Sequence, residues 1–408
     1  MSMKNITASI LYVGADDTTL DLFESQYEIP EGVSYNSYVI KDQKIAVMDT
    51  VDHRATDPWF DNLEEALDGK APDYLVVSHM EPDHAGNVAR FISKYPDTIV
   101  VGNTKTFVFM EQFFGKEVIQ EKLPEEKRYV VKEGDVLSLG QHTLQFFMAP
   151  MVHWPEVMVA FEQKEKVLFS ADGFGTFGAL KDTLTIGSDE EAAAWADEAR
   201  RYFINIVGKY GPSVQALLKK AAALEIGTIA PLHGPVLTDN LVFFIDKYMK
   251  WSSYTPEESG VVVAFSSLHG NTAKAAHFFG ECVKEAAQEK GIDMPVVVYD
   301  LSRCDQAEAV AGSFQYDRIA LLGVTYDGGL MPCMEDFLYH LKIKNFQNRK
   351  AAVVENGTWG PVSGKLMKEA LEAMKNVTVL EETVTIRSVM NTENEHSLKN
   401  LAIQLISE

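Results

Sequence analysis

The chain has 408 residues, of which 46% are hydrophobic and 24% charged, so it is long enough for two domains of ordinary globular composition. Its 59 Asp and Glu outnumber 37 Lys and Arg, and the formal charge of −22 argues against a nucleic acid or an anionic membrane surface as partner. Three cysteines form no CxxC pair, and no apolar leader or membrane-length apolar run is present, so we expect a cytoplasmic protein without a disulfide framework.

The first part of the chain predicts many short strands and few helices. Strands are expected at residues 10–13, 34–39, 44–48, 74–78, 99–101, 129–131, 144–148, 157–161, 166–170 and 227–231. Helices are expected at residues 85–95, 192–206 and 213–224. The middle helix follows a capping-box pattern that begins at Ser188.

The second part predicts a regular alternation of strands and helices. Residues 251–260 are polar and turn-forming, so we expect two domains, at residues 1–252 and 260–408. Beyond this boundary, strands are expected at residues 261–265, 296–299, 319–324, 351–355 and 378–386. Because each of the five strands is followed by a helix, this domain is expected to be a doubly wound parallel sheet.

Four potential metal ligands occupy six positions immediately after the expected strand 74–78. The run reads His79-Met80-Glu81-Pro82-Asp83-His84. Two imidazoles and two carboxylates so close together are costly to hold without a compensating cation. Imidazole and carboxylate donors suit iron, manganese or zinc, so the run predicts a metal site with room for two ions.

Three further candidates, His153, Asp172 and His233, lie where later strands of the first part end. Alone, a His or Asp at a strand end is usually an ordinary polar residue or part of a turn. Together with the run they supply four imidazoles and three carboxylates, which suits two ions that share one carboxylate. We interpret five other histidines as ordinary polar residues: His53, His142, His277, His340 and His396.

These motifs resemble the metallo-β-lactamase fold, an αββα sandwich in which the usual run is His-x-His-x-Asp-His. Here Glu81 stands at the second imidazole, and a harder carboxylate donor favours Fe(III) and redox chemistry over zinc-dependent hydrolysis. The chain is therefore similar to the flavodiiron proteins. The resemblance implies one iron on His79, Glu81 and His153, a second on Asp83, His84 and His233, and Asp172 as the bridge. In some members the histidine equivalent to His84 is not a ligand.

Three loops in the second part predict a site for a mononucleotide phosphate and a ring. They contribute Ser266, Ser267, Leu268, His269, Gly270, Asn271, Thr272, then Thr325, Tyr326, Asp327, Gly328, Gly329, and finally Asn356, Gly357, Thr358, Trp359, Gly360. Small residues before a helix allow backbone N–H groups to reach a phosphate, while Tyr326 or Trp359 is available to cover a ring. The loops lack GxGxxG and GK[ST] motifs, and the resemblance to flavodoxin implies FMN.

The resemblance implies an oxidoreductase that reduces O2 to water, NO to N2O, or both, at a non-haem diiron site supplied through FMN. It also implies a head-to-tail homodimer or a dimer of dimers. Because paired CxxC motifs are missing, we expect a separate electron donor such as a rubredoxin, F420H2 or an NADH-linked reductase. The alternatives are a zinc-dependent hydrolase fused to a flavodoxin, and an electron shuttle with a structural metal.

Overall fold

A computed structural model of the chain describes residues 4–407. The backbone divides into two compact units, Met1–Phe203 with Pro212–Met249, and Ile204–Gly211 with Lys250–Glu408. The segment Ile204–Gly211 thus groups with the second unit, although it precedes the turn-forming stretch. The predicted domain limits, 1–252 and 260–408, remain a prediction.

The first unit contains two seven-stranded sheets. The first sheet has the order β1 (Lys4–Asn5), β2 (Ile10–Tyr12), β7 (Tyr38–Ile40), β8 (Ala46–Met48), β9 (Tyr74–Val76), β10 (Ile99–Gly102) and β11 (Arg128–Val130). Strands β1 to β8 pair antiparallel in this order, whereas β8, β9, β10 and β11 pair in parallel. The parallel part matters for function because its strands all end at one edge.

The second sheet has the order β12 (Val136–Ser138), β13 (Thr143–Met148), β14 (Met158–Glu162), β15 (Val167–Phe169), β17 (Thr228–Ala230), β18 (Val236–Leu237) and β16 (Thr185–Ile186). Alternate residues of both sheets, such as Met48 and Val76 from the first and Phe146 and Ala160 from the second, form one buried core between them. The remaining strands of this unit form two antiparallel two-stranded ribbons. One pairs β3 (Ala15–Asp17) with β6 (Val33–Tyr35), and the other pairs β4 (Leu22–Phe23) with β5 (Tyr27–Glu28).

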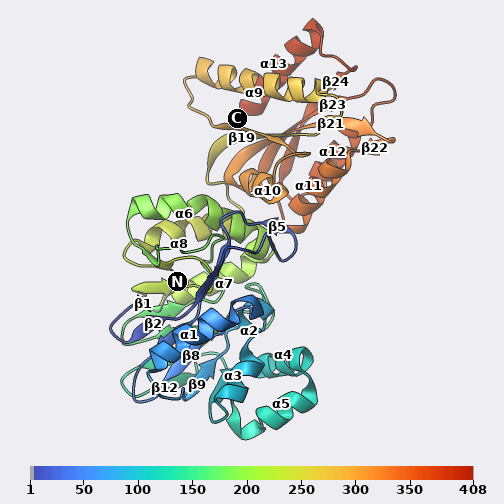
Figure 1. Cartoon of the computed structure of the whole chain (residues 1–408). Coiled ribbons are helices and arrows are strands. Elements are labelled where there is room, and N and C mark those ends of the chain that lie inside the picture. The colour runs from blue at the N-terminus through green and yellow to red at the C-terminus, as the bar shows by residue number, and fades with distance from the viewer. Residues whose placement is uncertain (1–3, 408) are drawn as a thin grey trace. The chain divides into compact units, whose positions relative to one another are not determined.

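The helices of this part are α1 (Thr56–Leu67), α2 (Pro82–Ala85), α3 (Val88–Lys94), α4 (Thr104–Phe114), α5 (Lys116–Lys122), α6 (Asp189–Tyr202), α7 (Gly211–Ala221) and α8 (Leu241–Ser252) (Figure 1). Short helical turns lie at η1 (His53–Ala55), η2 (Glu125–Lys127), η3 (Phe203–Val207) and η4 (Gly208–Tyr210). The capping box at Ser188 is present, since its side chain accepts from the Glu191 backbone N–H and Glu191 reaches back. Helices α1 and α3 pack through Trp59 and Phe91, whose ring centroids lie 6.1 Å apart.

Two predictions for this part need correction. The expected strand 34–39 is two strands, because Asn36 interrupts it and donates its side-chain amide to the carbonyl oxygens of Pro231 (2.9 Å) and Gly234 (2.8 Å). The expected helix 85–95 begins only at Val88. Asn87, just before it, has non-helical backbone angles and donates to the Val51 carbonyl oxygen at 2.9 Å.

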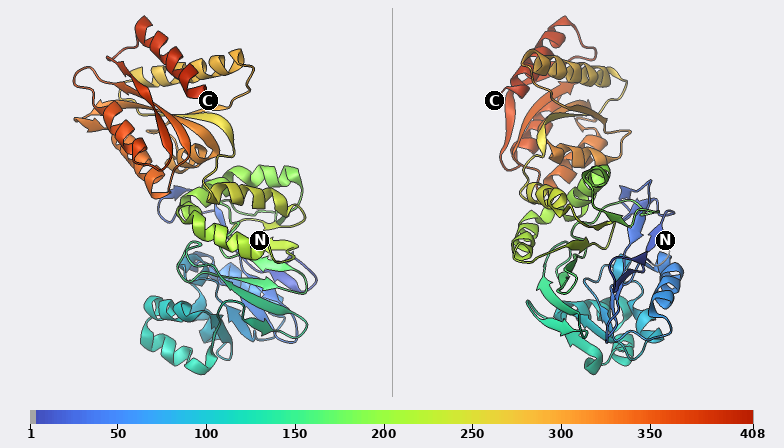
Figure 2. Two further views of the ribbon diagram at one scale, coloured as in Figure 1. Left: turned by 180° about the vertical axis from the view of Figure 1, so that it is seen from behind. Right: turned by 90° about the vertical axis from the view of Figure 1, so that its left-hand side faces the viewer.

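The second unit is built on a parallel sheet of the order β20 (Val296–Asp300), β19 (Glu258–Phe265), β21 (Tyr316–Tyr326), β23 (Arg349–Asn356) and β24 (Val377–Ile386). A short strand, β22 (Gly329–Leu330), pairs antiparallel with β21. The helices are α9 (Asn271–Glu289), α10 (Gln306–Gln315), α11 (Pro332–Ile343), α12 (Ser363–Glu372) and α13 (Thr392–Ile406). Helices α9 and α13 cover one face and α10 to α12 the other (Figures 1 and 2).

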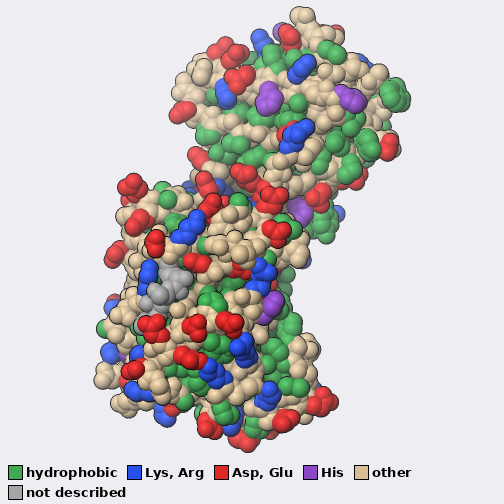
Figure 3. Space-filling view, viewed as in Figure 1, with side chains coloured by type: hydrophobic (Ala, Val, Ile, Leu, Met, Phe, Trp, Pro, Cys, Tyr) green, Lys and Arg blue, Asp and Glu red, His purple; other side chains and the backbone are tan. Residues whose placement is uncertain are grey.

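The predicted fold class is confirmed: a two-sheet sandwich with flanking helices precedes a doubly wound sheet of flavodoxin strand order. On the face drawn in Figure 3, Lys and Arg side chains are interspersed among Asp and Glu rather than gathered into one basic surface. Within residues 4–407, every helix is too short or too polar to cross a membrane.

Candidate metal centre

The seven predicted metal ligands come from loops at the strand ends of the two sheets in the first unit. His79 follows β9, and Pro82 then opens the short helix α2, which carries Asp83 and His84. Asp172 follows β15, His153 lies between β13 and β14, and His233 lies between β17 and β18. The fold therefore brings together residues that are up to about 150 positions apart, and it brings together all seven.

The first group consists of His79, Glu81 and His153, and it faces one oxygen of Asp172. The Nε2 atom of His153 lies 2.8 Å from Glu81 Oε2, and that of His79 lies 3.6 Å from the same oxygen. Asp172 Oδ2 lies 3.0 Å from His79 Nε2 and 3.3 Å from His153 Nε2. Three side chains and one carboxylate oxygen thus converge on one point.

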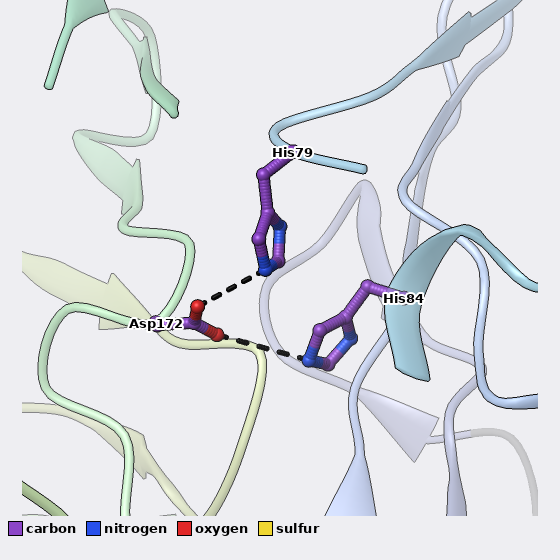
Figure 4. Close-up of side chains that lie close together, drawn as sticks. All are labelled: His79, His84 and Asp172. Atoms are coloured by element: carbon purple, nitrogen blue, oxygen red, sulfur yellow. Dashed lines mark ion pairs between the residues drawn. The ribbon is translucent and has the colours of Figure 1, made fainter. Parts of the chain in front are cut away.

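The second group consists of Asp83, His84 and His233, and it faces the other oxygen of Asp172. His233 Nε2 lies 3.1 Å from Asp83 Oδ2 and 2.9 Å from His84 Nε2. Asp172 Oδ1 lies 3.8 Å from both imidazole nitrogens. Figure 4 shows the Asp172 carboxylate pointing between His79 and His84, one from each group. Asp172 Oδ2 therefore lies beside the first group of donors, and Asp172 Oδ1 lies beside the second group.

These separations fit metal ions. Donors held about 2.1 Å from one ion lie about 3.0 Å apart when adjacent and about 4.2 Å apart when opposite. The observed distances run from 2.8 Å, slightly below the adjacent value, to 3.8 Å, below the opposite value. Both oxygens of Asp172 and of Asp83 are buried without a hydrogen-bond partner, as is Nε2 of His79. Such groups are costly unless a cation satisfies them, so the donor set fits the dinuclear iron centre that the resemblance implies.

The pKa values show how strongly these groups interact. Burial would raise the pKa of Glu81, but the adjacent His153 and His79 lower it to about 2. Burial and the nearby Glu81 charge raise the pKa of Asp83 to about 6. Burial and the neighbouring His233 hold the pKa of His84 well below its usual range. His84 is thus favoured as a neutral imidazole, the form that binds metals.

Polar groups around the donors fix their orientation. The Nδ1 atom of His233 lies 2.8 Å from the Ser34 carbonyl oxygen, to which it donates, so Nε2 presents its lone pair to the centre. Asn36 supports the same loop through the two carbonyl oxygens named above. The His84 carbonyl oxygen accepts from both the backbone N–H and the hydroxyl of Thr50, at 3.0 and 2.6 Å.

Two buried carboxylates that the sequence analysis did not single out hold the His79 run. Asp49 accepts from the Ser78 backbone N–H at 2.6 Å and from its hydroxyl at 2.7 Å. Glu156 accepts from the Met80 backbone N–H at 2.8 Å. Asp49 directly follows β8, so the strand-end pattern that revealed His79 also marks it. Glu156 has no such pattern, and only its distance of three residues from His153 points to it.

The second unit has a cavity of about 380 Å³ at the carboxyl edge of its sheet, where the three predicted loops meet. The N-terminus of α9 points into this region without a side-chain cap. Ser267 Oγ organises the loop by accepting from the N–H groups of Gly270 (3.1 Å) and Ala273 (3.2 Å), and the Ser266 hydroxyl is buried without a partner. Free N–H groups and hydroxyls at a helix N-terminus fit a phosphate, as FMN requires.

All predicted loop residues line this cavity except Ser266, Gly270, Tyr326 and Gly329. Tyr326 and Gly329 pair with each other in the β21–β22 ribbon, which takes them out of the lining. Trp359 does line it and is 84% exposed, so it is the aromatic residue that remains available to a ring. Ser388, which follows β24, lines the cavity but was not predicted.

Comparisons with known proteins agree with this architecture. A family model described as ODP family beta lactamase matches residues 33–234. An anaerobic nitric oxide reductase flavorubredoxin from Vibrio vulnificus is 27% identical over 359 residues, which cover 87% of this chain and 70% of that protein. One from Aeromonas hydrophila is 26% identical over 380 residues, covering 92% and 74%.

Solved structures extend the likeness to both units. The rubredoxin oxygen:oxidoreductase from the anaerobe Desulfovibrio gigas matches with a TM-score of 0.88 and 25% identity, covering 99% of this chain and 98% of that one. The flavodiiron protein from Giardia intestinalis matches with a TM-score of 0.87 and 23% identity, covering 99% and 96%.

Sequence and fold define a protein class in which a metallo-β-lactamase-like domain with a candidate dinuclear centre is joined to a flavodoxin-like domain. Over both units, the chain is similar to the flavodiiron proteins. This confirms the resemblance that the His79 run, its three downstream partners and the flavin loops indicated.

Proposed function

We propose that the chain is an oxidoreductase that reduces O2 to water, NO to N2O, or both, at a non-haem diiron centre supplied with electrons through FMN. The observation that carries this proposal is the arrangement of Asp172, whose two oxygens face two separate groups of donors, one of which contains Glu81. The names of the similar proteins, a nitric oxide reductase and a rubredoxin oxygen:oxidoreductase, describe these two reactions.

When bound, a diiron centre would supply the redox chemistry for reduction of the gas, and FMN would supply the electrons. We propose that His79, Glu81 and His153 hold one iron, that Asp83, His84 and His233 hold the other, and that Asp172 bridges them. We propose the loop residues that line the cavity in the second unit as the FMN site.

The protein's own part is to fix donors, tune their charge and control access. Glu81 brings a negative, hard donor where a hydrolase has a neutral imidazole, which stabilises Fe(III) and makes redox cycling accessible. The donors nearest to solvent are His153, Glu81 and Asp83, with 11%, 13% and 11% of their side chains exposed, whereas His79 and His84 are fully buried. A small gas therefore has access from the side on which these three residues lie.

The aromatic rings around the second group exclude water. Phe23 and Tyr35 approach the His233 ring edge-on, at centroid distances of 5.4 and 6.1 Å, and Tyr202 lies 5.5 Å from it. Burial in this apolar surround lowers the pKa of His84, which favours its neutral form, and the low dielectric strengthens the interaction of the donors with a cation.

Anaerobic kinetics with each gas test the proposal. Protein containing about two irons and one FMN per chain is mixed with a reduced rubredoxin, and consumption of NO and of O2 is measured separately. Rapid consumption of at least one gas, lost on removal of iron or of FMN, is expected. Fully loaded protein that consumes neither gas would overturn the proposal.

The zinc hydrolase is the second candidate, since the donor set of imidazoles and carboxylates also accepts zinc and the matching family model is named for a beta lactamase. Metal analysis after expression with both metals available separates the two. Iron at two per chain supports the proposed reductase, whereas zinc with esterase or thiolesterase activity supports the hydrolase. An electron shuttle with a structural metal predicts FMN reoxidation by the gases that does not depend on iron.

We further propose a separate electron donor, a rubredoxin, F420H2 or an NADH-linked reductase, a cytoplasmic location, and a head-to-tail homodimer or dimer of dimers. The family resemblance supports these assignments. A monomeric variant is expected to keep both cofactors and to lose turnover, as measured by light scattering, cofactor content and gas consumption. A monomer with full activity would overturn the dimer proposal.

A further inference from the structure

Glu24 places a fourth carboxylate beside the candidate centre, at a position that the sequence analysis did not consider. It lies at the tip of the ribbon formed by β4 and β5. A carboxylate oxygen of Glu24, one of Glu81 and a ring nitrogen of His153 all lie within 4.8 Å of one another. Glu24 thus approaches the more accessible of the two donor groups from its solvent side.

The ribbon holds this position through a defined turn and a buried anchor. Glu24 and Ser25 both have left-handed backbone angles, with φ of 49° and 57°, and the Gln26 N–H donates to the Phe23 carbonyl oxygen at 3.0 Å. The preceding ring, Phe23, is buried and packs edge-on against His233. The residue next to Glu24 is therefore fixed to a residue of the same centre.

The geometry suits a ligand rather than a distant charge. Opposite donors of one ion are about 4.2 Å apart. The ligand atoms of Glu24, Glu81 and His153 lie within 4.8 Å of one another, so a small rotation of the Glu24 side chain brings its carboxylate to this distance. The first group supplies four protein donors when the Asp172 oxygen is included. Iron with oxygen and nitrogen donors commonly takes six, so positions remain for Glu24 and for a gas. Glu24 itself is exposed, as a displaceable ligand requires.

We propose that Glu24 is an eighth protein ligand of the diiron centre, a displaceable carboxylate on the ion that His79, Glu81 and His153 hold. This inference rests on the proposed diiron centre. Binding and release of the Glu24 carboxylate exchange one ligand without any change in oxidation state. A further anionic donor stabilises Fe(III) more than Fe(II), so Glu24 favours the oxidised centre and leaves more readily from the reduced one.

The test uses the FMN-containing, iron-loaded protein and compares Glu24→Gln with Glu28→Gln, an exposed carboxylate on the same ribbon. The oxidised proteins are challenged with the Fe(III) chelator desferrioxamine, and the release of each iron is followed. In Glu24→Gln, one of the two irons is expected to be lost at about tenfold lower chelator concentration, the order of effect seen when a metal site loses a supporting group. Glu28→Gln is expected to behave as wild type.

Two further readouts separate ligation from a structural role. The iron reduction potential is expected to rise in Glu24→Gln and not in Glu28→Gln. In Glu24→Ala, added acetate is expected to restore iron retention, because it supplies the missing carboxylate. If Glu24→Gln matches wild type in iron release and potential, the inference is wrong and the proposed function stands. If the wild-type protein holds no pair of irons, both are wrong.

Discussion

The Nε2 atoms of His84 and His233 lie 2.9 Å apart in a fully buried position. Because the Nδ1 proton of His233 is donated to the Ser34 carbonyl oxygen, the Nε2 atom of a neutral His233 presents its lone pair toward His84. Two facing imidazole nitrogens are attractive only if one is protonated or if both bind a cation. Burial and His233 lower the pKa of His84, whereas Asp83 and Asp172 raise the pKa of His233 against the effect of burial, so in the metal-free pair the proton lies on His233.

This relationship predicts that metal stabilises the fold. Removing both ions leaves the buried carboxylates of Asp83 and Asp172 with only the neighbouring imidazoles to compensate them, so the thermal midpoint of the iron-free protein is expected to fall by about 5 °C or more. Differential scanning calorimetry of the iron-loaded protein and of protein stripped of iron by a chelator measures the two thermal midpoints. Iron is added back to the stripped protein as the control. Equal midpoints would show that the cluster is stable without a cation.

Glu81→His is expected to shift the centre from iron toward zinc and to weaken gas reduction, because a neutral donor replaces a hard anionic one. Metal content after growth with both metals, together with NO and O2 consumption, measures the change. The control is Glu126→His, which adds an imidazole at an exposed position. Unchanged iron content and activity would show that the carboxylate does not select the metal.

Asp49→Ala is expected to destabilise the protein by about 3 kcal/mol, because it removes both acceptors of Ser78 and leaves a buried backbone N–H without a partner. Urea unfolding measures the loss, and Asp61→Ala, on the exposed side of α1, is the control. Since Ser78 immediately precedes His79, iron retention is expected to fall as well. If Asp49→Ala is as stable as wild type, Asp49 does not stabilise the segment before His79 through its hydrogen bonds with Ser78.

The ion pair between Asp17 and Arg54 predicts a defined acid response. Burial alone would raise the pKa of Asp17 from 3.8, but hydrogen bonds from Arg54, at 2.6 Å, and from Thr19 and Leu20 lower it to about 2. A lowered carboxyl pKa contributes stability that is present above the unfolded value near 3.8 and is lost as the pH falls through about 2.

Arg54→Met is therefore expected to cost about 1 kcal/mol at pH 7, a value reduced for the partial exposure of the arginine, and almost nothing at pH 2. Chemical unfolding of both proteins between pH 7 and pH 2 checks this. A difference in stability that stays constant over this range would mean that the pair does not hold the Asp17 carboxylate.

Ser267→Ala is expected to weaken FMN binding about tenfold, because the Ser267 hydroxyl oxygen accepts from Gly270 and Ala273 and shapes the loop before α9. Quenching of FMN fluorescence on titration into flavin-free protein measures the affinity. Ser302→Ala, exposed and outside the cavity lining, is the control. If Ser267→Ala binds FMN as tightly as wild type does, the loop before α9 is not part of the flavin site.

Much of the architecture follows from local patterns. The five strands of the second unit, each followed by a helix, were predictable because parallel strands are buried on both faces and read as apolar runs. The convergence of the seven candidate ligands was predictable because they are polar residues near strand ends, where such folds collect chemistry. Their division into two groups was not predictable from spacing, because it depends on how the two sheets pack.

Other elements have weak local signals. Helix α4 was not predicted, since its sequence Thr-Lys-Thr-Phe-Val-Phe-Met is rich in β-branched and aromatic residues, and tertiary packing overrides that preference. Its start is marked only by the capping box of Asn103 and Thr106. Glu24 was missed because it lies in a polar turn, where a carboxylate is ordinary until the fold shows what it faces.

In the proposed diiron centre, the shared position of Asp172 would couple the two metal-binding steps thermodynamically. An ion held by the first group would order the carboxylate and so prepare the second group, which would lower the entropic cost of binding the next ion. Loading is therefore expected to be cooperative, with little of the protein carrying a single ion at intermediate iron supply. A cell short of iron would contain a mixture of fully loaded and metal-free molecules, and its gas-reducing capacity would fall in proportion to the loaded fraction.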